Sequence, residues 1–405
     1  MPPAIKVELL QEAVDTFQAT GSNYAQAALI LGIPRPTLQS RIEQARRRGI
    51  TPHTADPNDP LQLKSQIKRL QSDLREAQQE RVNHEMIKHK IIGLTREVNE
   101  VTPPVWMKSR ETSHSQPGVP TLLVSDLHWG EVVDGRQING VNQYNLDIAH
   151  ARIRHLAERT VHLCEIISPK MEYPGLVLPF GGDMFSGNIH DELTATNELN
   201  SMPCVLDLYG TLVWMIKFFL EYFPAVFIPC VTGNHGRDTK KIWAKDRHHT
   251  SFDWLLYCLL AKYFEQDKRV TFLIPDGPDA YYQVYSHSYL LTHGDQFRGG
   301  DGVIGPLGPI IRGDHRKRSR NSQINMPYDT MIMGHWHFYV HLARLIVNSS
   351  LKGYDEYAFR ENFPYEPAQQ ALWLTHPKYR ITYRMPVQVQ QFKDVKVKPW
   401  VSIVG

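Results

Sequence analysis

Five short apolar runs each end in residues that commonly bind metal ions, and this pattern constrains the fold more than any other feature of the chain. The runs are Thr121 to Ser125, Leu176 to Phe180, Val226 to Thr232, Tyr289 to Thr292 and Thr330 to Met333. The polar residues that follow them are Asp126 and His128, Asp183, Asn234 and His235, His293 and Asp295, and His335 and His337. Ligand sites in α/β sheets form at the carboxyl ends of strands. We therefore expect these side chains to converge on one pocket of an α/β domain that begins near residue 120.

The residue types at these strand ends suit divalent metal ions. In Asp126-x-His128 and His335-x-His337, two side chains spaced two residues apart point to the same side of an extended segment. Carboxylate and amide oxygens mixed with imidazole nitrogens suit a divalent ion without thiolates. These candidate ligands are too many for one ion. They fit two ions that share a carboxylate, which is the arrangement used to split phosphate esters. We expect two ions, with Mn²⁺ as the first choice and Fe²⁺, Zn²⁺ or Mg²⁺ as alternatives.

The ordered set of motifs resembles the calcineurin-like metallophosphoesterase family over residues 120–350. The resemblance implies a four-layer αββα sandwich with a dinuclear site at its edge. It implies one ion bound by Asp126, His128, Asp183 and His337, and a second bound by Asp183, Asn234, His293 and His335. Asp183 would bridge the ions and is, with His235, a predicted catalytic residue. His235 matches the family's non-ligand histidine, which would stabilise the transition state or protonate the leaving oxygen.

The chain departs from the family pattern at two points. Gly236 and Arg237 follow the Asn-His pair where the family usually has an acidic residue. We expect Asp238 or Asp295 to orient His235 instead, and Arg237 to contact the substrate phosphate. The segment from Gly182 to Ser186 lacks the Asp-Arg-Gly signature of the protein Ser/Thr phosphatases, which disfavours that branch.

Residues 1–50 predict three short helices, with a break at Gly32-Ile33-Pro34 before a basic third helix. The string from Ala27 to Leu38 resembles the Fis-type helix-turn-helix of bacterial regulators. That resemblance implies that the last helix enters the DNA major groove, and we expect Arg35, Thr37, Gln39 and Arg41 to contact DNA. The alternative is a small helical bundle that only mediates assembly.

Residues 51–119 predict a linker and a long linker helix. The stretch TPHTADPNDP is rich in turn formers. Leu63, Ile67, Leu70, Leu74 and Ala77 then follow the spacing of a coiled-coil seam, so residues 63–98 predict a homo-oligomer or, alternatively, a helix packed on the next domain. The expected domains are 1–50 (helix-turn-helix), 51–119 (linker and coiled-coil-like helix) and 120–405 (phosphoesterase). We expect the tail from residue 351 to complete the sandwich or cap the site.

Basic residues between the last two motifs bear on the substrate. Five arginines and lysines lie between Arg312 and Arg320, which we expect to form a basic loop near the site, with Arg316 and Arg318 as substrate contacts. His190 is a further candidate contact. This loop and the N-terminal helices together favour a polyanion, and DNA in particular. The predicted function is two-metal-dependent hydrolysis of DNA phosphodiester bonds, as a nuclease. The alternatives are a phosphatase or phosphodiesterase for nucleotides or another small phosphate ester, and a DNA-binding regulator with a metal-sensing domain.

Cysteine usage and hydropathy indicate a cytoplasmic protein without a membrane partner. None of the four cysteines lies in a CxxC pair, which predicts buried thiols in a reducing compartment. The start, MPPAIKVELLQ, lacks the basic flank and apolar core of a secretory signal. Charged residues and prolines interrupt the apolar stretch from Val205 to Thr232, so it predicts a buried helix followed by a strand.

Overall fold

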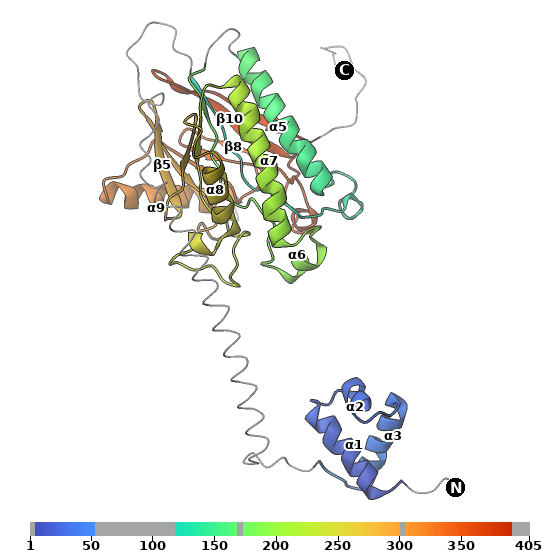
Figure 1. The fold of residues 1–405 in the computed structure, drawn as a ribbon. Helices are drawn as coiled ribbons and strands as arrows, with labels where there is room; N and C mark the ends of the chain where they lie inside the picture. The colour runs from blue at the N-terminus through green and yellow to red at the C-terminus, as the bar shows by residue number, and fades with distance from the viewer. Residues whose placement is uncertain (1–4, 53–117, 168–172, 300–304, 391–405) are drawn as a thin grey trace, which may run out of the picture. The chain divides into compact units, whose positions relative to one another are not determined.

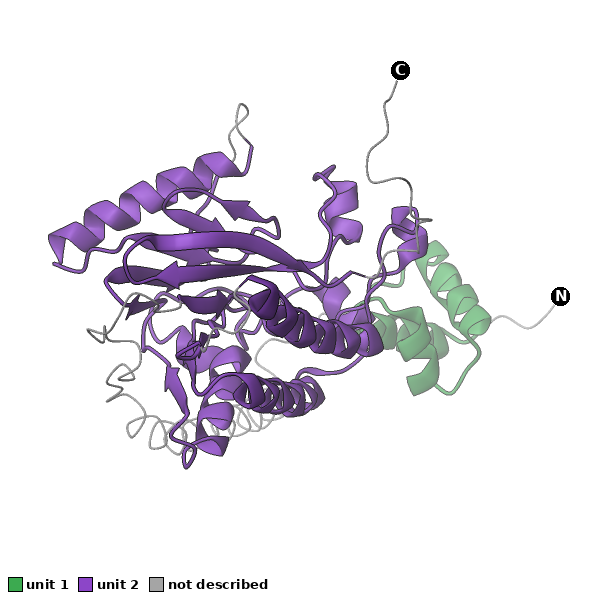
Figure 2. Cartoon of the chain, turned by 90° about the horizontal axis from the view of Figure 1, so that it is seen from above, with its two compact units in different colours: residues 1–85 green, residues 86–405 purple. Residues whose placement is uncertain are grey.

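The computed structural model describes residues 5–52, 118–167, 173–299 and 305–390 (Figure 1). The chain forms two compact units, Met1–Glu85 and Met86–Gly405 (Figure 2). The predicted coiled-coil seam at residues 63–98, and nearly all of the predicted linker, lie outside the described residues. The predicted assembly through that seam therefore stays a prediction.

The first unit contains the three predicted helices, α1 (Val7–Ala19), α2 (Tyr24–Ile30) and α3 (Arg35–Arg47). Asn23 caps α2, since its side-chain oxygen accepts hydrogen bonds from the backbone N–H groups of Ala25 and Gln26. Ala13, Leu38 and Ile42 pack in the core between the helices. Arg35, Thr37 and Gln39 on α3 are exposed and Arg41 is half-buried, so these side chains remain accessible for the predicted DNA contact.

The first sheet of the second unit has the strand order β11-β10-β1-β2-β3-β4. Its central strands β1, β2, β3 and β4 are parallel, and β10 and β11 add antiparallel strands at one edge. The bounds are β1 (Val119–Leu122), β2 (Leu176–Val177), β3 (Val226–Pro229), β4 (Val270–Leu273), β10 (Gln369–His376) and β11 (Arg380–Gln388). Because β10 pairs with β1, the described part of the tail completes the sandwich, as predicted.

The second sheet has the strand order β5-β6-β7-β9-β8. Its strands β6, β7 and β9 are parallel, with antiparallel neighbours at both edges. The bounds are β5 (Asp279–Val284), β6 (His287–Thr292), β7 (Thr330–Met333), β8 (Val340–His341) and β9 (Leu345–Val347). All five predicted strands are thus confirmed, and each lies in the parallel part of its sheet.

Successive apolar residues of the strands face opposite sides and so separate the layers. Leu122 faces the helices α5 (Leu146–Ile167), α7 (Ser201–Tyr222) and α8 (Phe252–Tyr263), while Leu123 packs between the sheets. Leu291 also lies between the sheets, whereas Leu290 packs on the side of α9 (Leu307–Gln323). The unit is therefore a mixed α/β structure with layers in the order helices, first sheet, second sheet and helix (Figure 1). Short helices lie in the connections: η2 (Gly135–Ile138), α6 (Asp191–Thr196), η3 (His248–Thr250) and α10 (Glu356–Arg360).

Helix α9 corrects one expectation. The basic segment from Arg312 to Arg320 is part of this helix and not a loop. A loop was expected because the segment connects the last two motifs near the site. Pro309 lies in the first turn, where its missing N–H removes no intrahelical bond, and Gly313 packs directly beneath the Phe297 ring.

Among the described residues, α7 is the one helix long and apolar enough to cross a membrane by length and composition. Leu208, Leu212 and Ile216 on α7 belong to the core that also contains residues of α5 and α8. The predicted helix-then-strand order of this stretch is confirmed by α7 and β3.

Candidate metal centre

Two groups of ligand-type side chains meet at the carboxyl ends of the parallel strands. The first group is Asp126, His128 and His337, whose candidate ligand atoms lie within 4.8 Å of one another. His337 Nε2 lies 3.0 Å from His128 Nε2 and 3.4 Å from Asp126 Oδ1. Two imidazole nitrogens and a buried carboxylate oxygen that face one point can bind a divalent cation.

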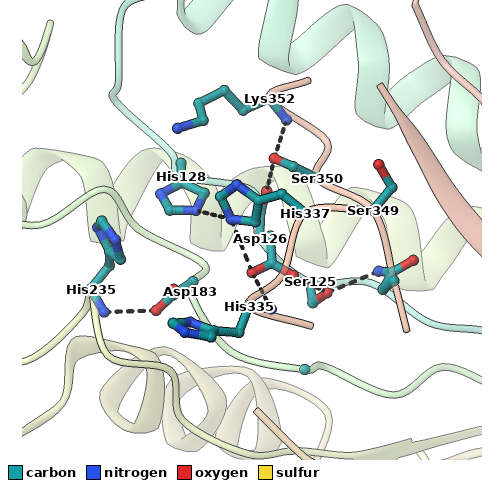
Figure 3. A network of polar contacts seen from close by, with 12 residues as sticks. Ser125, Asp126, His128, Asp183, His235, His335, His337, Ser349, Ser350 and Lys352 are labelled. Atoms are coloured by element: carbon teal, nitrogen blue, oxygen red, sulfur yellow. Dashed lines mark hydrogen bonds and ion pairs between the residues drawn. The ribbon is translucent and has the colours of Figure 1, made fainter. Parts of the chain in front are cut away.

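The second group is Asp183, His293 and His335. His293 Nε2 lies 3.0 Å from Asp183 Oδ2 and 3.2 Å from the side-chain oxygen of Asn234. Asp183 also forms a cluster with His128 and His235, so its carboxylate lies between the two groups (Figure 3). Seven predicted ligands from five separate loops therefore come together, and Asp183 has the position expected of a shared ligand.

The backbone at this centre is strained. Asp126, His128, Asp183, His335 and His337 all have φ between 47° and 67°, a region that side chains other than glycine rarely adopt. Such residues cost about 1–3 kcal/mol each and persist where the surrounding structure holds them. Seven other described non-glycine residues also have positive φ, but none of them is a candidate ligand, whereas five of the seven candidate ligands have this backbone conformation.

Glycines allow the loops to approach one another. A Cβ added to Gly233 would lie 2.1 Å from Asp183 Oδ1, and one added to Gly334 would lie 2.2 Å from Asp126 Oδ2. The carboxylates of Asp126 and Asp183 thus rest against neighbouring backbone.

We expect Gly233→Ala to weaken metal binding by at least about 10- to 100-fold, the range for altered groups that hold ligands. The added methyl group must displace the Asp183 carboxylate. Gly210→Ala is the matched control, because Gly210 lies on the exposed side of α7 with no atom within 4 Å of its added Cβ. The control should bind metal normally and unfold at slightly higher temperature. Titration calorimetry measures both affinities, and equal affinities for the two variants would contradict the close approach.

The protonation states also fit a bound cation. Burial, followed by the nearby Lys352 charge, lowers the pKa of His128 to about 4. Burial and His293 likewise lower the pKa of His335 to about 4. Burial acts against protonation of His293 too, but the Asp183 carboxylate outweighs it and raises the pKa of His293 to about 10. Neutral imidazoles can bind metal, and the imidazolium of His293 supplies a positive charge between carboxylates where a cation would supply it instead.

Asp253, which sequence reasoning missed, connects two of the loops that carry candidate ligands. Its carboxylate accepts backbone hydrogen bonds from Asp183 (3.1 Å), Met184 (3.2 Å) and Gly233 (2.8 Å). Burial and the Asp183 charge raise the pKa of Asp253 to about 7. Asp253 comes from the start of α8, 20 residues after Gly233, and no motif marks it.

A buried network of hydrogen bonds holds Asp126 in place (Figure 3). The Ser125 hydroxyl donates to Asp126 Oδ2 at 2.5 Å and accepts from the Asn348 side-chain amide at 2.9 Å. Ser350 donates to the Asp126 carbonyl oxygen at 2.9 Å. Residues 348–350 follow β9 directly, and sequence reasoning assigned them no role.

Lys352 forms a second buried support. Its ammonium group lies 2.7 Å from Glu131 Oε1 and 2.6 Å from Asp355 Oδ2. Glu131 Oε2 in turn lies 3.3 Å from His128 Nδ1. This last contact is not an ion pair at neutral pH because the His128 imidazole is neutral.

Lys352→Met should lower the free energy of unfolding by about 3–5 kcal/mol, because it leaves two buried carboxylates without their cation. The neighbouring Lys352 charge holds the pKa of Asp355 below its ordinary value even though burial opposes this. The Asp355 contribution is therefore present above about pH 4 and lost at lower pH, so the difference between variant and parent should shrink in acid. Urea unfolding measures it, with the exposed Lys268→Met as control. Equal stabilities of the two variants at pH 7 would contradict the role of Lys352.

His235 is held by backbone and not by the expected carboxylate. Its Nδ1 lies 2.9 Å from the Ser186 carbonyl oxygen, and its backbone N–H donates to Asp183 Oδ1 at 2.7 Å. Asp295, one expected partner, instead forms an ion pair with Arg247 at 2.8 Å. The His190 ring lies 6.3 Å from the His235 ring, so this candidate contact is also beside the centre.

The predicted substrate-binding arginines have different surroundings. The Arg237 guanidinium donates to the carbonyl oxygens of Asn234 and Thr239. Arg318 pairs with Asp314 and donates to the Tyr328 carbonyl oxygen, both at 2.8 Å. Arg316 is exposed and lines a pocket. Of the three, Arg316 is the residue whose guanidinium forms no hydrogen bond or ion pair with the described residues.

Comparisons with known proteins give distant structural likenesses. No family model and no curated protein matches the sequence. Similar solved structures include a conserved uncharacterized protein, described as a predicted phosphoesterase, from Streptococcus pneumoniae TIGR4 (10% identity, 67% of this chain and 99% of that chain, TM-score 0.26). Others are Vacuolar Protein Sorting 29 from Cryptosporidium parvum (14%, 64% and 86%, TM-score 0.26) and phosphopantetheinyl hydrolase from Mycobacterium tuberculosis (11%, 62% and 95%, TM-score 0.24).

Proposed function

We propose that the chain is a metal-dependent phosphoesterase that hydrolyses phosphodiester bonds in DNA. The observation that supports this most is the pair of adjacent His/Asp clusters with the Asp183 carboxylate between them. Asp126, His128 and His337 would hold one divalent ion, with Asp183 shared. Asp183, Asn234, His293 and His335 would hold the second.

The Lewis acidity of divalent ions held at this centre would lower the pKa of a water molecule and offset the negative charge of phosphate oxygens. The residues around it position the reacting groups. Asp253 fixes the two loops that carry Asp183 and Asn234, and the Ser125 network fixes Asp126. The centre lies at the ends of the strands, where a phosphate can approach.

His235 is proposed to assist departure of the leaving oxygen. Since Nδ1 faces the Ser186 carbonyl, the Nδ1–H tautomer is fixed and Nε2 is left for the substrate. Burial lowers the pKa of His235, but an approaching phosphate anion favours the imidazolium. The protonated Nε2 can then donate to the leaving oxygen.

DNA is proposed as the substrate because basic residues lie on α9 and on exposed positions of α3. Purified protein incubated with Mn²⁺ and labelled single- and double-stranded DNA tests this, with a chelator and metal re-addition as the control. Metal-dependent cleavage supports the proposal. Turnover of small phosphate esters alone would contradict DNA as the substrate, and salt-sensitive binding without any turnover would contradict the enzyme assignment.

A further inference from the structure

A pocket of about 600 Å³ lies beside the candidate metal centre, and the proposed chemistry leaves it unused. Thr232 and Gln296 line it, two residues before Asn234 and three residues after His293. At 3.8 Å between successive Cα atoms, these positions are at most about 8 Å and 11 Å from the candidate ligands. Arg247, also in the wall, donates to the Gly233 carbonyl oxygen and so ties the pocket to the loop that carries Asn234.

The pocket wall contains more basic than acidic side chains, which favours a phosphate: Arg247, Arg298, Arg312, Arg316, Lys317 and Arg320 against Asp246 and Asp276. Lys317 and Arg320 in its wall both pair with the Asp279 carboxylate, and Arg247 pairs with Asp295. Arg298 and Arg316 are exposed in the same wall and form no ion pair or hydrogen bond with the residues that the structure describes. Two guanidinium groups without carboxylates can bind phosphate oxygens in a bidentate manner.

The pocket also presents an aromatic face and an unused polar atom. Trp243 lines the wall and is 52% exposed, which is a large apolar surface to leave in water. His248 lines it too and is buried, and its Nε2 has no hydrogen-bond partner among the described residues. The Oδ1 atom of Asp276 lies 3.8 Å from this Nε2, beyond hydrogen-bond distance. An exposed tryptophan near free guanidinium groups is the combination that binds single-stranded nucleic acid, since bases stack on the ring and phosphates contact the arginines.

We propose that this pocket binds one nucleotide of a single-stranded nucleic acid next to the scissile phosphate, with its base on Trp243 and its phosphate on Arg298 and Arg316. The inference rests on the proposed function for the identity of the neighbouring scissile group. It adds the substrate class of the site: a strand with an unpaired base beside the cleaved bond.

The test measures binding of 5′-phosphorylated (dT)₄ to the full chain by titration calorimetry, with chelator present so that no cleavage occurs. Trp243→Ala should weaken binding by about 5- to 150-fold, the range for loss of one base–aromatic stack, and Trp243→Phe should restore most of it. The double variant Arg298→Gln/Arg316→Gln should reduce the slope of log K against log salt concentration by about 0.7, the contribution of the one phosphate that both arginines bind. Tyr379→Ala and Arg159→Gln, at exposed positions outside the pocket wall, are the matched controls and should bind as the parent does.

Hydrolysis of methyl p-nitrophenyl phosphate with Mn²⁺ separates this inference from the proposed function. Pocket variants that keep the parent rate on this small diester and lose affinity for (dT)₄ support the pocket. Binding by Trp243→Ala within twofold of the parent would overturn it, as would an equal loss in the control variants. Absence of diester hydrolysis in the parent would refute the proposed function, while the (dT)₄ affinities would still decide whether the pocket binds a nucleotide.

Discussion

Asp183→Asn is expected to abolish metal binding and nearly all hydrolysis. Asp183 lies between the two candidate clusters, with Oδ2 3.0 Å from His293 Nε2 and Oδ1 accepting the His235 backbone N–H. Asparagine keeps the shape but removes the charge that both proposed ions would share. Several kcal/mol of transition-state stabilisation should be lost, so turnover should fall on the order of 10³-fold or more.

Elemental analysis after dialysis, together with the diester assay, measures both effects of Asp183→Asn. Asp147→Asn is the control, because Asp147 is an exposed carboxylate in the first turn of α5. It should keep the parent metal content and rate. An Asp183→Asn protein that retained two ions per chain would contradict the shared-ligand position.

His235→Ala is expected to retain bound metal and reduce turnover by about 10²- to 10⁴-fold, the range for loss of a general acid. The effect should depend on the leaving group. p-Nitrophenolate departs without a proton, so its ester should lose less rate than a dinucleotide, whose sugar alkoxide needs one.

His155→Ala, on the exposed side of α5, is the control for the loss of an imidazole and should match the parent. Metal content and kcat for both substrates are the measurements. Equal losses for the two leaving groups would rule out proton donation by His235 and leave only transition-state stabilisation. Unchanged rates for both substrates would rule out any role for His235 in the reaction.

The sequence predicted the scaffold well because strand formation is local. Apolar runs of strand length indicate buried parallel strands whatever packs on them, and all five are strands in the structure. Polar residues that follow parallel strands meet at one edge of a sheet, which is why Asp126 and Asp183 lie close together after β1 and β2. His293 follows β6 of the second sheet, and it reaches Asp183 because the two sheets pack on each other. The helix from Arg35 was equally readable from its spacing of Leu38, Ile42 and Ala45.

Two features that depend on tertiary packing were predicted wrongly from the sequence, the conformation of the basic segment and the partner of His235. The segment from Arg312 to Arg320 was expected to be a loop because it connects two site motifs, but it lies in the helix α9, where Gly313 packs closely against Phe297. The partner of His235 was expected to be the carboxylate of Asp238 or Asp295, because the family that the sequence resembles usually has an acidic residue after the Asn-His pair. A backbone carbonyl such as that of Ser186 carries no sequence signal.

By itself, then, the sequence determined the strands and the residue types at their ends, because these depend on neighbours within a few positions. Only the tertiary structure decided which side chains hold the strand ends in place and which side chains line an accessible pocket. Asp253 bridges two loops, Lys352 pairs with Glu131 from 221 residues away, and Trp243 with Arg316 faces a common pocket. Such contacts depend on how the layers pack, and no periodicity in the chain records them.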